Sequence, residues 1–365
     1  MNIIEHPGIR LREMLGKNEW LQTDLVFILG CQPKSVNQII NGKQGITPTM
    51  SKMLGDAFGV SSSYFSELQI EYDLARSEDP DASIKSRAKI VSHYPIREMI
   101  KRGWIQNEHA DDLESQLCRF FKTNTLDSIP HLDHNAKKTS YDEVSGKQLA
   151  WLFRVKQIAS EMLVDSYSNT KLENAIDQLS SLREEPEEIR HVAKILSKAG
   201  VRFLVVEGLP GGKIDGVCFW LDARSPVISL TLRFDRIDNF WFVLRHEIAH
   251  VLHGHGKLSA IIDSDMDGSI NDTDEQERIA NIEAAEFCVP QKDMKSFYIR
   301  KKPLFSDRDI CAFSKRIHVH PGLVAGQLHR LTEQYQYHRK HLTKIRNFVL
   351  STTIADGWGN TVPIG

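Results

Sequence analysis

The chain has 365 residues, which is enough for two or three folded domains. Apolar residues make up 41% of the chain and charged residues 26%, as in ordinary globular proteins, so a fibrous or wholly disordered chain is excluded. The formal net charge of -2 offers no global electrostatic attraction for nucleic acid.

The cysteine pattern and the lack of long apolar runs indicate the cellular compartment of the protein. Five cysteines are scattered along the chain without a C-x-x-C pair, which is typical of buried thiols in a reducing compartment. The chain does not open on a charged-then-apolar leader, and it contains no run of 18 apolar residues. We therefore expect a cytoplasmic protein that does not engage a membrane.

Residues 1–75 show a pattern of short helices around glycine turns. The predicted helices span residues 8–15, 22–29, 34–41 and 48–58. Gly30 permits the positive φ of a tight turn, and Pro33 opens the helix that follows it. Thr47 is expected to cap the fourth helix. Two helices around such a turn form a helix-turn-helix unit, whose second helix enters the DNA major groove.

These residues resemble the HigA-type antitoxins, a subfamily of the lambda-repressor-like (XRE) DNA-binding domains. The matching residues are His6-Pro7-Gly8, Trp20-x-Gln22, Leu25, Leu29-Gly30, Asn41-Gly42-Lys43, Gly45-Ile46-Thr47-Pro48 and Met50. The resemblance implies operator DNA as a partner, bound by a homodimer. It places Gln32, Lys34, Ser35, Asn37 and Gln38 against the DNA, with Lys43 suited to guanine or phosphate. Because charge in the module is nearly balanced, an all-α protein-binding module remains the alternative.

Residues 76–190 predict a helical connecting region that carries no catalytic constellation. From Val201 onward the apolar pattern changes to that of strands. The predicted strands are Phe203–Val206, Val217–Trp220 and Val227–Leu232. These short strands precede another helical pattern, so a small sheet packed against helices is expected there.

The stretch His246-Glu247-Ile248-Ala249-His250 reads H-E-x-x-H. On a helix, residues four apart lie on one face, so two imidazoles there can bind one Zn²⁺. The intervening Glu247 can act as general base toward a water at the metal. The flanking apolar residues predict an amphipathic helix, with Asp238 or Asn239 as its cap.

A third zinc ligand is needed, and its choice follows from the residues after the motif. A histidine six residues past His250 would serve in one zincin class, but Gly256 stands there. A glutamate on a later helix is the other common choice, and Glu277 opens a strongly helical run. Asn281 lies one turn after Glu277 and can accept a hydrogen bond from a ligating imidazole.

This part of the chain resembles the ImmA/IrrE metallo-endopeptidase family. The resemblance rests on His246-Glu247-x-x-His250, Glu277-x-x-Ala280-Asn281, Ala284-Ala285 and Val289-Pro290, with further matches upstream at Leu209-Pro210 and Ile214-Asp215-Gly216. Glu283 departs from the family, which carries phenylalanine there. The resemblance implies that His246, His250 and Glu277 hold zinc, that Glu247 is the general base, and that the substrate is a protein.

Two further patterns stand outside these modules. The acidic loop at residues 263–274 follows most of a calcium-loop pattern but ends on aspartate, so calcium or a plain acidic hairpin both remain open. The segment Ile317–Val324 repeats the apolar and proline positions of Leu29–Val36. We expect a second helix-turn-helix-like unit there, used for packing.

The sequence therefore predicts a mainly α protein with a small β-sheet, of the α+β class. Its predicted domains are a helix-turn-helix domain at 1–75, a helical connecting region at 76–190, a zincin-like domain at 191–300 and a helical region at 301–365. The first functional hypothesis is a DNA-binding regulator with a zinc-dependent endopeptidase. The alternative is a non-catalytic antitoxin that binds operator DNA and a toxin, with zinc in a structural or sensory role.

Overall fold

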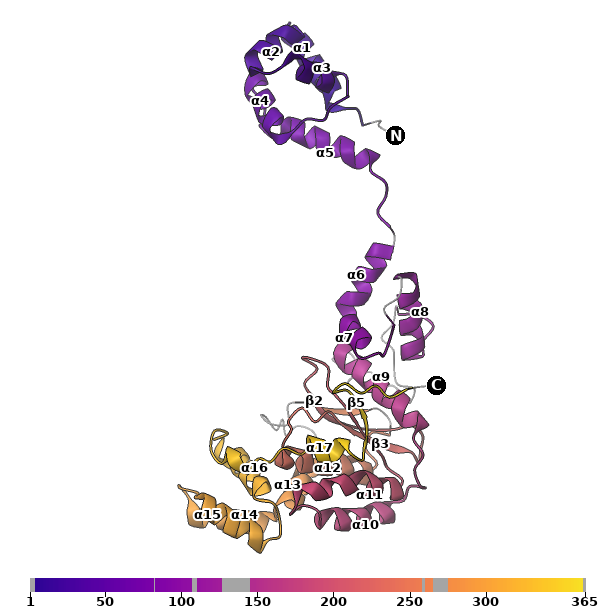
Figure 1. Ribbon diagram of the computed structural model, residues 1–365, viewed down its shortest axis with the longest axis vertical. Coiled ribbons are helices and arrows are strands. Elements are labelled where there is room, and N and C mark those ends of the chain that lie inside the picture. The colour runs from indigo at the N-terminus through magenta and orange to yellow at the C-terminus, as the bar shows by residue number, and fades with distance from the viewer. Residues whose placement is uncertain are drawn as a thin grey trace. The chain divides into compact units, whose positions relative to one another are not determined.

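The computed structural model describes residues 4–81, 83–106, 110–126, 145–257, 260–264 and 275–363. Over these ranges the protein is mainly helical with one five-stranded mixed sheet, so the predicted α+β class is confirmed. The chain divides into two compact units, Met1–Ile84 and Lys85–Gly365, which we call unit 1 and unit 2 (Figure 1). The finer division at residues 190 and 300 stays a prediction. Among the described helices, none combines the length and apolar character that crossing a membrane requires.

Unit 1 is a bundle of short helices around a small apolar core. Its helices are α1 (Pro7–Lys17), α2 (Gln22–Leu29), α3 (Pro33–Ile40), α4 (Pro48–Phe58) and α5 (Tyr64–Arg76). Leu25, Val36 and Phe65 are among the side chains buried at the centre. An added Cβ at Gly8 would lie 2.0 Å from the Ile39 carbonyl oxygen, so only glycine allows α1 and α3 to approach this closely.

The turn between α2 and α3 has the backbone that the sequence predicts. Gly30 is left-handed, with φ of +60°, and Pro33 is the first residue of α3. The Thr47 hydroxyl accepts the Met50 N–H at 3.2 Å, which confirms the predicted cap of α4. Leu21 has no side-chain oxygen to cap α2, and the Asp24 carboxylate instead accepts the Leu21 N–H at 2.7 Å.

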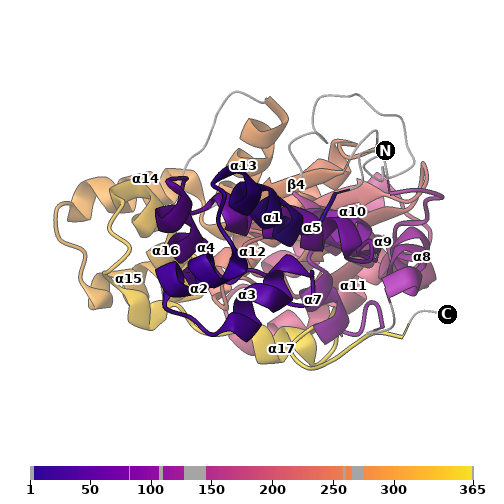
Figure 2. The ribbon, with the colours of Figure 1, turned by 90° about the horizontal axis from the view of Figure 1, so that it is seen from above.

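Unit 2 begins within α6 and is built around the sheet. Its helices are α6 (Ser83–His93), α7 (Ile96–Lys101), α8 (Ala110–Phe121), α9 (Gly146–Glu161), α10 (Asn169–Ser180), α11 (Val192–Lys198), α12 (Ile237–Leu252), α13 (Glu275–Cys288), α14 (Gln291–Lys301), α15 (Asp307–Arg316), α16 (Pro321–Thr332) and α17 (Arg346–Leu350), with short 3-10 helices at Pro186–His191 and Arg339–His341. Figure 2 shows α14, α15 and α16 gathered at the same side of this unit.

The sheet has the strand order β4-β2-β3-β1-β5. Its strands are β1 (Arg202–Val206), β2 (Ile214–Trp220), β3 (Pro226–Leu230), β4 (Ile261–Ser264) and β5 (Ile354–Asp356). β1 pairs in parallel with β3 and β5, whereas β2 is antiparallel to β3 and β4. The predicted third strand was two residues too long, because β3 ends at Leu230.

Helices cover both faces of the sheet, which explains why β2 and β3 are buried along their whole length. Alternate residues of each strand point to opposite faces, so β1 places Phe203 and Val205 in one core and Leu204 and Val206 in the other. Helices α10 to α17 contribute to the first core, and helices α6 to α9 contribute to the second. Helix α12 therefore lies directly on the sheet (Figure 1).

A buried ion pair holds β5 at the edge of the sheet. Arg154 on α9 pairs with Asp356 on β5, and the two residues are 4% and 0% exposed. The Trp104 indole N–H also donates to Asp356, and the Arg154 guanidinium donates to the Val362 carbonyl oxygen at 2.6 Å. The carboxylate is thus the centre of a network that joins α9, β5 and the chain beyond it.

We expect Asp356→Ala to destabilise unit 2 strongly, because it leaves the Arg154 cation buried without a carboxylate. Breaking a buried pair from one side costs about 3–5 kcal/mol. Urea denaturation of the purified variant would measure the loss. Asp293→Ala is the matched control, since Asp293 forms an exposed pair with Arg316. Equal stability of the two variants would contradict this account of β5.

Candidate metal centre and nucleic-acid interface

Helix α12 carries the H-E-x-x-H motif and is buried from Ile237 to Val251. The predicted cap is wrong, because the helix starts earlier than its apolar pattern indicates. Arg236 is the N-cap residue and makes no side-chain capping bond. Asp238 lies in the first turn instead, paired with Arg236 at 2.6 Å, where a carboxylate interacts favourably with the helix dipole.

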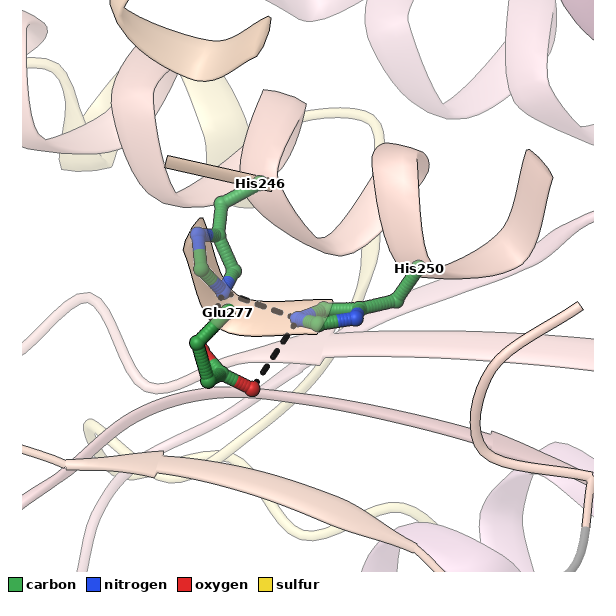
Figure 3. Close-up of side chains that lie close together, drawn as sticks. All are labelled: His246, His250 and Glu277. Carbon is green, nitrogen blue, oxygen red and sulfur yellow. Dashed lines mark hydrogen bonds and ion pairs between the residues drawn. The ribbon is translucent and has the colours of Figure 1, made fainter. Parts of the chain in front are cut away.

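His246, His250 and Glu277 come together as the sequence spacing predicts (Figure 3). The two Nε2 atoms of His246 and His250 lie 2.9 Å apart. The Glu277 carboxylate oxygens lie 3.2 Å from His246 Nε2 and 3.4 Å from His250 Nε2. Both histidines are completely buried, whereas the Glu277 side chain is 29% exposed, so the cluster opens to solvent on the α13 side.

Hydrogen bonds at the far ring nitrogens orient both imidazoles. The Nδ1 of His246 lies 3.1 Å from the Asn281 side-chain oxygen, which can only accept, so Nδ1 donates and Nε2 keeps its lone pair. The Nδ1 of His250 lies 3.0 Å from the Nδ1 of His255. For His250 to present a lone pair at Nε2, its Nδ1 must donate to His255.

His255 is a site residue that the sequence analysis missed. It lies beyond the end of α12 and returns to His250 because Gly254 and Gly256 are left-handed, with φ of +68° and +75°. The Trp220 indole N–H donates to the His255 carbonyl oxygen at 2.9 Å, which ties this loop to β2. The glycines on either side of His255 were the sequence signal that could have predicted this tight loop.

Glu247 is buried between α12 and the sheet. An added Cβ at Gly216 of β2 would lie 2.1 Å from Glu247 Oε1 and 2.9 Å from Val243. Any larger residue at position 216 would therefore displace the carboxylate. Glycine is thus required at the end of the family-like stretch Ile214-Asp215-Gly216, because the side chain of Glu247 occupies the space that a Cβ would fill.

Glu283, the residue that departs from the family pattern, joins α13 to α12. Its carboxylate accepts hydrogen bonds from Arg245 at 2.8 Å and from His253 at 2.7 Å. Partial burial raises the pKa of Glu283, but the hydrogen bond from His253 and the charge of Arg245 outweigh it and hold that pKa below the usual value. Glu283 is therefore a charged contact between the two helices that carry the cluster.

The predicted DNA-contacting residues lie on and beside α3 in unit 1. The buried face of α3 holds Val36, Ile39 and Ile40. Of the predicted set, Gln32, Lys34, Asn37 and Lys43 are exposed, and Ser35 and Gln38 are half-buried. The α3 surface is therefore polar and open, as contact with a nucleic acid requires.

The remaining sequence patterns have different outcomes. Most of the acidic loop, residues 265–274, lies outside the described residues, so both interpretations of it stay predictions. The expected second helix-turn-helix-like unit is formed by α15 and α16, with His318 left-handed at φ +55° where Gly30 has +60°. Helix α16 is buried at seven of its positions, so it packs, as predicted.

Comparison with known protein families supports the interpretation of this region of unit 2. Residues 198–305 match the family model described as Peptidase_M78, the IrrE N-terminal-like domain. The match runs from the end of α11 into the segment after α14 and contains the whole cluster, but it covers less than a third of the chain. This region is thus similar to a family of metallopeptidases.

A comparison with curated proteins found no significant match. Among solved structures, the chain is similar to a Nostoc punctiforme protein described as an antidote of a plasmid maintenance system. The two are 25% identical, over 23% of this chain and 87% of that chain, with a TM-score of 0.19.

Proposed function

We propose that the protein is a transcription regulator that carries a zinc-dependent endopeptidase. The observation that carries this proposal is the convergence of His246, His250 and Glu277, with Glu247 on the same helix as the two histidines, inside the region that matches the IrrE-like model. The helix-turn-helix backbone of unit 1 supports the DNA-binding part.

The donor atoms fit zinc. Zinc–nitrogen bonds of about 2.0–2.1 Å in tetrahedral geometry separate ligand atoms by roughly 3.3 Å. The observed separations of 2.9, 3.2 and 3.4 Å lie close to that value. Two imidazoles and one carboxylate leave a fourth position for water, as in catalytic rather than structural zinc sites.

Bound zinc would lower the pKa of a water and polarise a peptide carbonyl. Glu247 would accept a proton from the attacking water and deliver it to the leaving amide nitrogen as the peptide bond breaks. Its carboxylate lies on the same helix as both histidines and is shielded from solvent, which strengthens its electrostatic interactions. Asn281 and His255 would hold the two imidazoles in the orientation that zinc requires.

We expect about one zinc per purified chain, and its loss in His250→Ala, because two remaining ligands hold the ion poorly. Asn281→Ala should weaken zinc affinity by about 10- to 100-fold, since it removes the group that orients His246. Elemental analysis and competition with a chelating dye would measure both. His191→Ala, at an exposed histidine outside the cluster, should bind like wild type. Equal zinc content in His250→Ala and wild type would refute the ligand assignment.

Glu247→Gln should retain zinc but lose proteolysis, because it keeps the shape of the side chain and removes the base. Loss of a general base costs about 10²- to 10⁴-fold in rate. Candidate regulators would be co-expressed with each form and their fragments read by mass spectrometry, with the exposed Glu187→Gln as control. Cleavage that persists in Glu247→Gln would overturn the mechanism. Absence of cleavage by wild type, with operator binding intact, would favour a non-catalytic antitoxin.

For unit 1 we propose sequence-specific binding of operator DNA by a homodimer. The exposed polar face of α3 offers amide side chains that suit adenine edges and Lys34 for guanine or phosphate. Paired units read two half-sites, and α5 exposes Ile70 and Leu74 one turn apart, at 58% and 68%. That apolar stripe suits contact with a second copy.

A Lys34→Ala, Gln38→Ala double variant should bind the protein's own promoter region at least about tenfold more weakly than wild type, because each lost base contact costs about 1–3 kcal/mol. Gel shifts over a range of salt concentrations would measure the difference. Lys52→Ala is the control, since Lys52 is exposed on α4 away from the turn. Unchanged binding by the double variant would show that α3 does not read the DNA.

A further inference from the structure

A concave site lies in unit 2 at the carboxyl ends of the parallel strands. It is a cavity of about 440 Å³, within the range of small-molecule sites. β1, β3 and β5 all end at this edge, and the loop Glu207–Lys213 that follows β1 forms one wall. Sheets of parallel strands commonly bind ligands beyond these ends.

Among the charged residues that line this cavity, cations outnumber carboxylates. Lys213, Arg233 and Arg346 line it, and the protein as a whole carries a formal charge of -2. Glu207 also lines it, but its carboxylate accepts the Trp358 N–H at 2.7 Å and lies 4.0 Å from Arg102. Asp215 and Asp235, which do not line the cavity, pair with Arg233 at 3.7 Å and with Arg346 at 4.0 Å. The lining itself carries more cations than carboxylates.

Arg346 is the cation best prepared for a ligand. Its Nε is buried and has no hydrogen-bond partner among the described residues. Its Nη1 pairs with Asp235 at 4.0 Å, its Nη2 donates to the Leu232 carbonyl oxygen at 3.2 Å, and the guanidinium stacks 5.3 Å from the centre of the Trp358 ring. A buried donor without a partner is costly unless an acceptor arrives, and a planar guanidinium suits the two oxygens of a phosphate or carboxylate.

The backbone around the cavity is held in an uncommon conformation. Lys213, Leu232 and Trp358 are left-handed, with φ of +56°, +48° and +50°, although none is glycine. Such residues cluster at ligand sites, where surrounding structure maintains the strain. Ile214, Thr231 and Leu209 form an apolar-rich floor that is at most 4% exposed.

We propose that this cavity binds a small organic molecule bearing a phosphate or carboxylate group, with Arg346 and Lys213 contacting the anionic oxygens. The site is separate from the His246–His250–Glu277 cluster, and binding there does not depend on the proposed peptidase activity. Phosphate and carboxylate ligands both present anionic oxygens, so the assay must distinguish between these two types.

Calorimetric titration of the full-length chain with matched probes tests the proposal. Ribose 5-phosphate with ribose as its neutral match represents the phosphate type, and glutarate with glutaramide represents the carboxylate type. We expect one anionic probe to bind at least about tenfold more tightly than its neutral match, as a charge-assisted hydrogen bond requires. Failure of both anionic probes to bind more tightly than their neutral matches would overturn the proposal.

Two variants locate the binding. Lys213→Gln and Arg346→Gln should each lower the affinity for the anionic probe at least about tenfold. Lys194→Gln removes an exposed lysine on α11, outside the cavity, and should leave binding unchanged. Because Lys213 is exposed, its variant should fold even if Arg346→Gln disturbs the stacking on Trp358. Binding by Lys213→Gln equal to that of Lys194→Gln would refute the site.

Discussion

The close approach of α12 to β2 is the constraint on which the rest of unit 2 depends. Glu247 points into the sheet at Gly216, where even a methyl group would meet its carboxylate. This close approach fixes the rotation of α12 about its own axis. His246 and His250 therefore lie on the side of α12 that α13 covers. Glu277 and Asn281 then meet the two imidazoles from α13.

The helices around α12 reinforce this placement at its two ends. At the start, an added Cβ at Gly326 of α16 would lie 2.5 Å from the Asp238 carboxylate, so α16 also approaches α12 very closely. At the end, Glu283 links α13 to Arg245 and His253. A phenylalanine at position 283 would hold the helices by packing alone, whereas the carboxylate makes the contact depend on two specific donors. The geometry of the cluster is thus set by neighbours that take no part in it.

How much of the site the sequence predicts depends on whether each contact is local. The pairs His246–His250 and Glu277–Asn281 follow from helical spacing, because residues four apart share a face in any helix. The choice of Glu277 as third ligand followed from zinc donor chemistry and the family resemblance. His255 and the role of Glu283 do not follow, since they depend on a left-handed glycine loop and on how α13 lies against α12. The predicted cap was wrong in part for the same reason: the first turn of α12 is buried and lies against Gly326 of α16, a contact distant in the sequence.

The two helix-turn-helix units show why backbone geometry alone does not assign a function. The turns at Gly30 and His318 have nearly the same φ, and each is followed by a helix that opens on proline. Helix α3 keeps one polar face exposed, whereas α16 is buried on most of its positions against α12, α13 and α15. Only the former presents a polar face to solvent within its own unit. Burial of the second helix, more than the turn that precedes it, therefore separates an exposed polar surface from a packing element that lies against the helices of the His246–His250–Glu277 cluster.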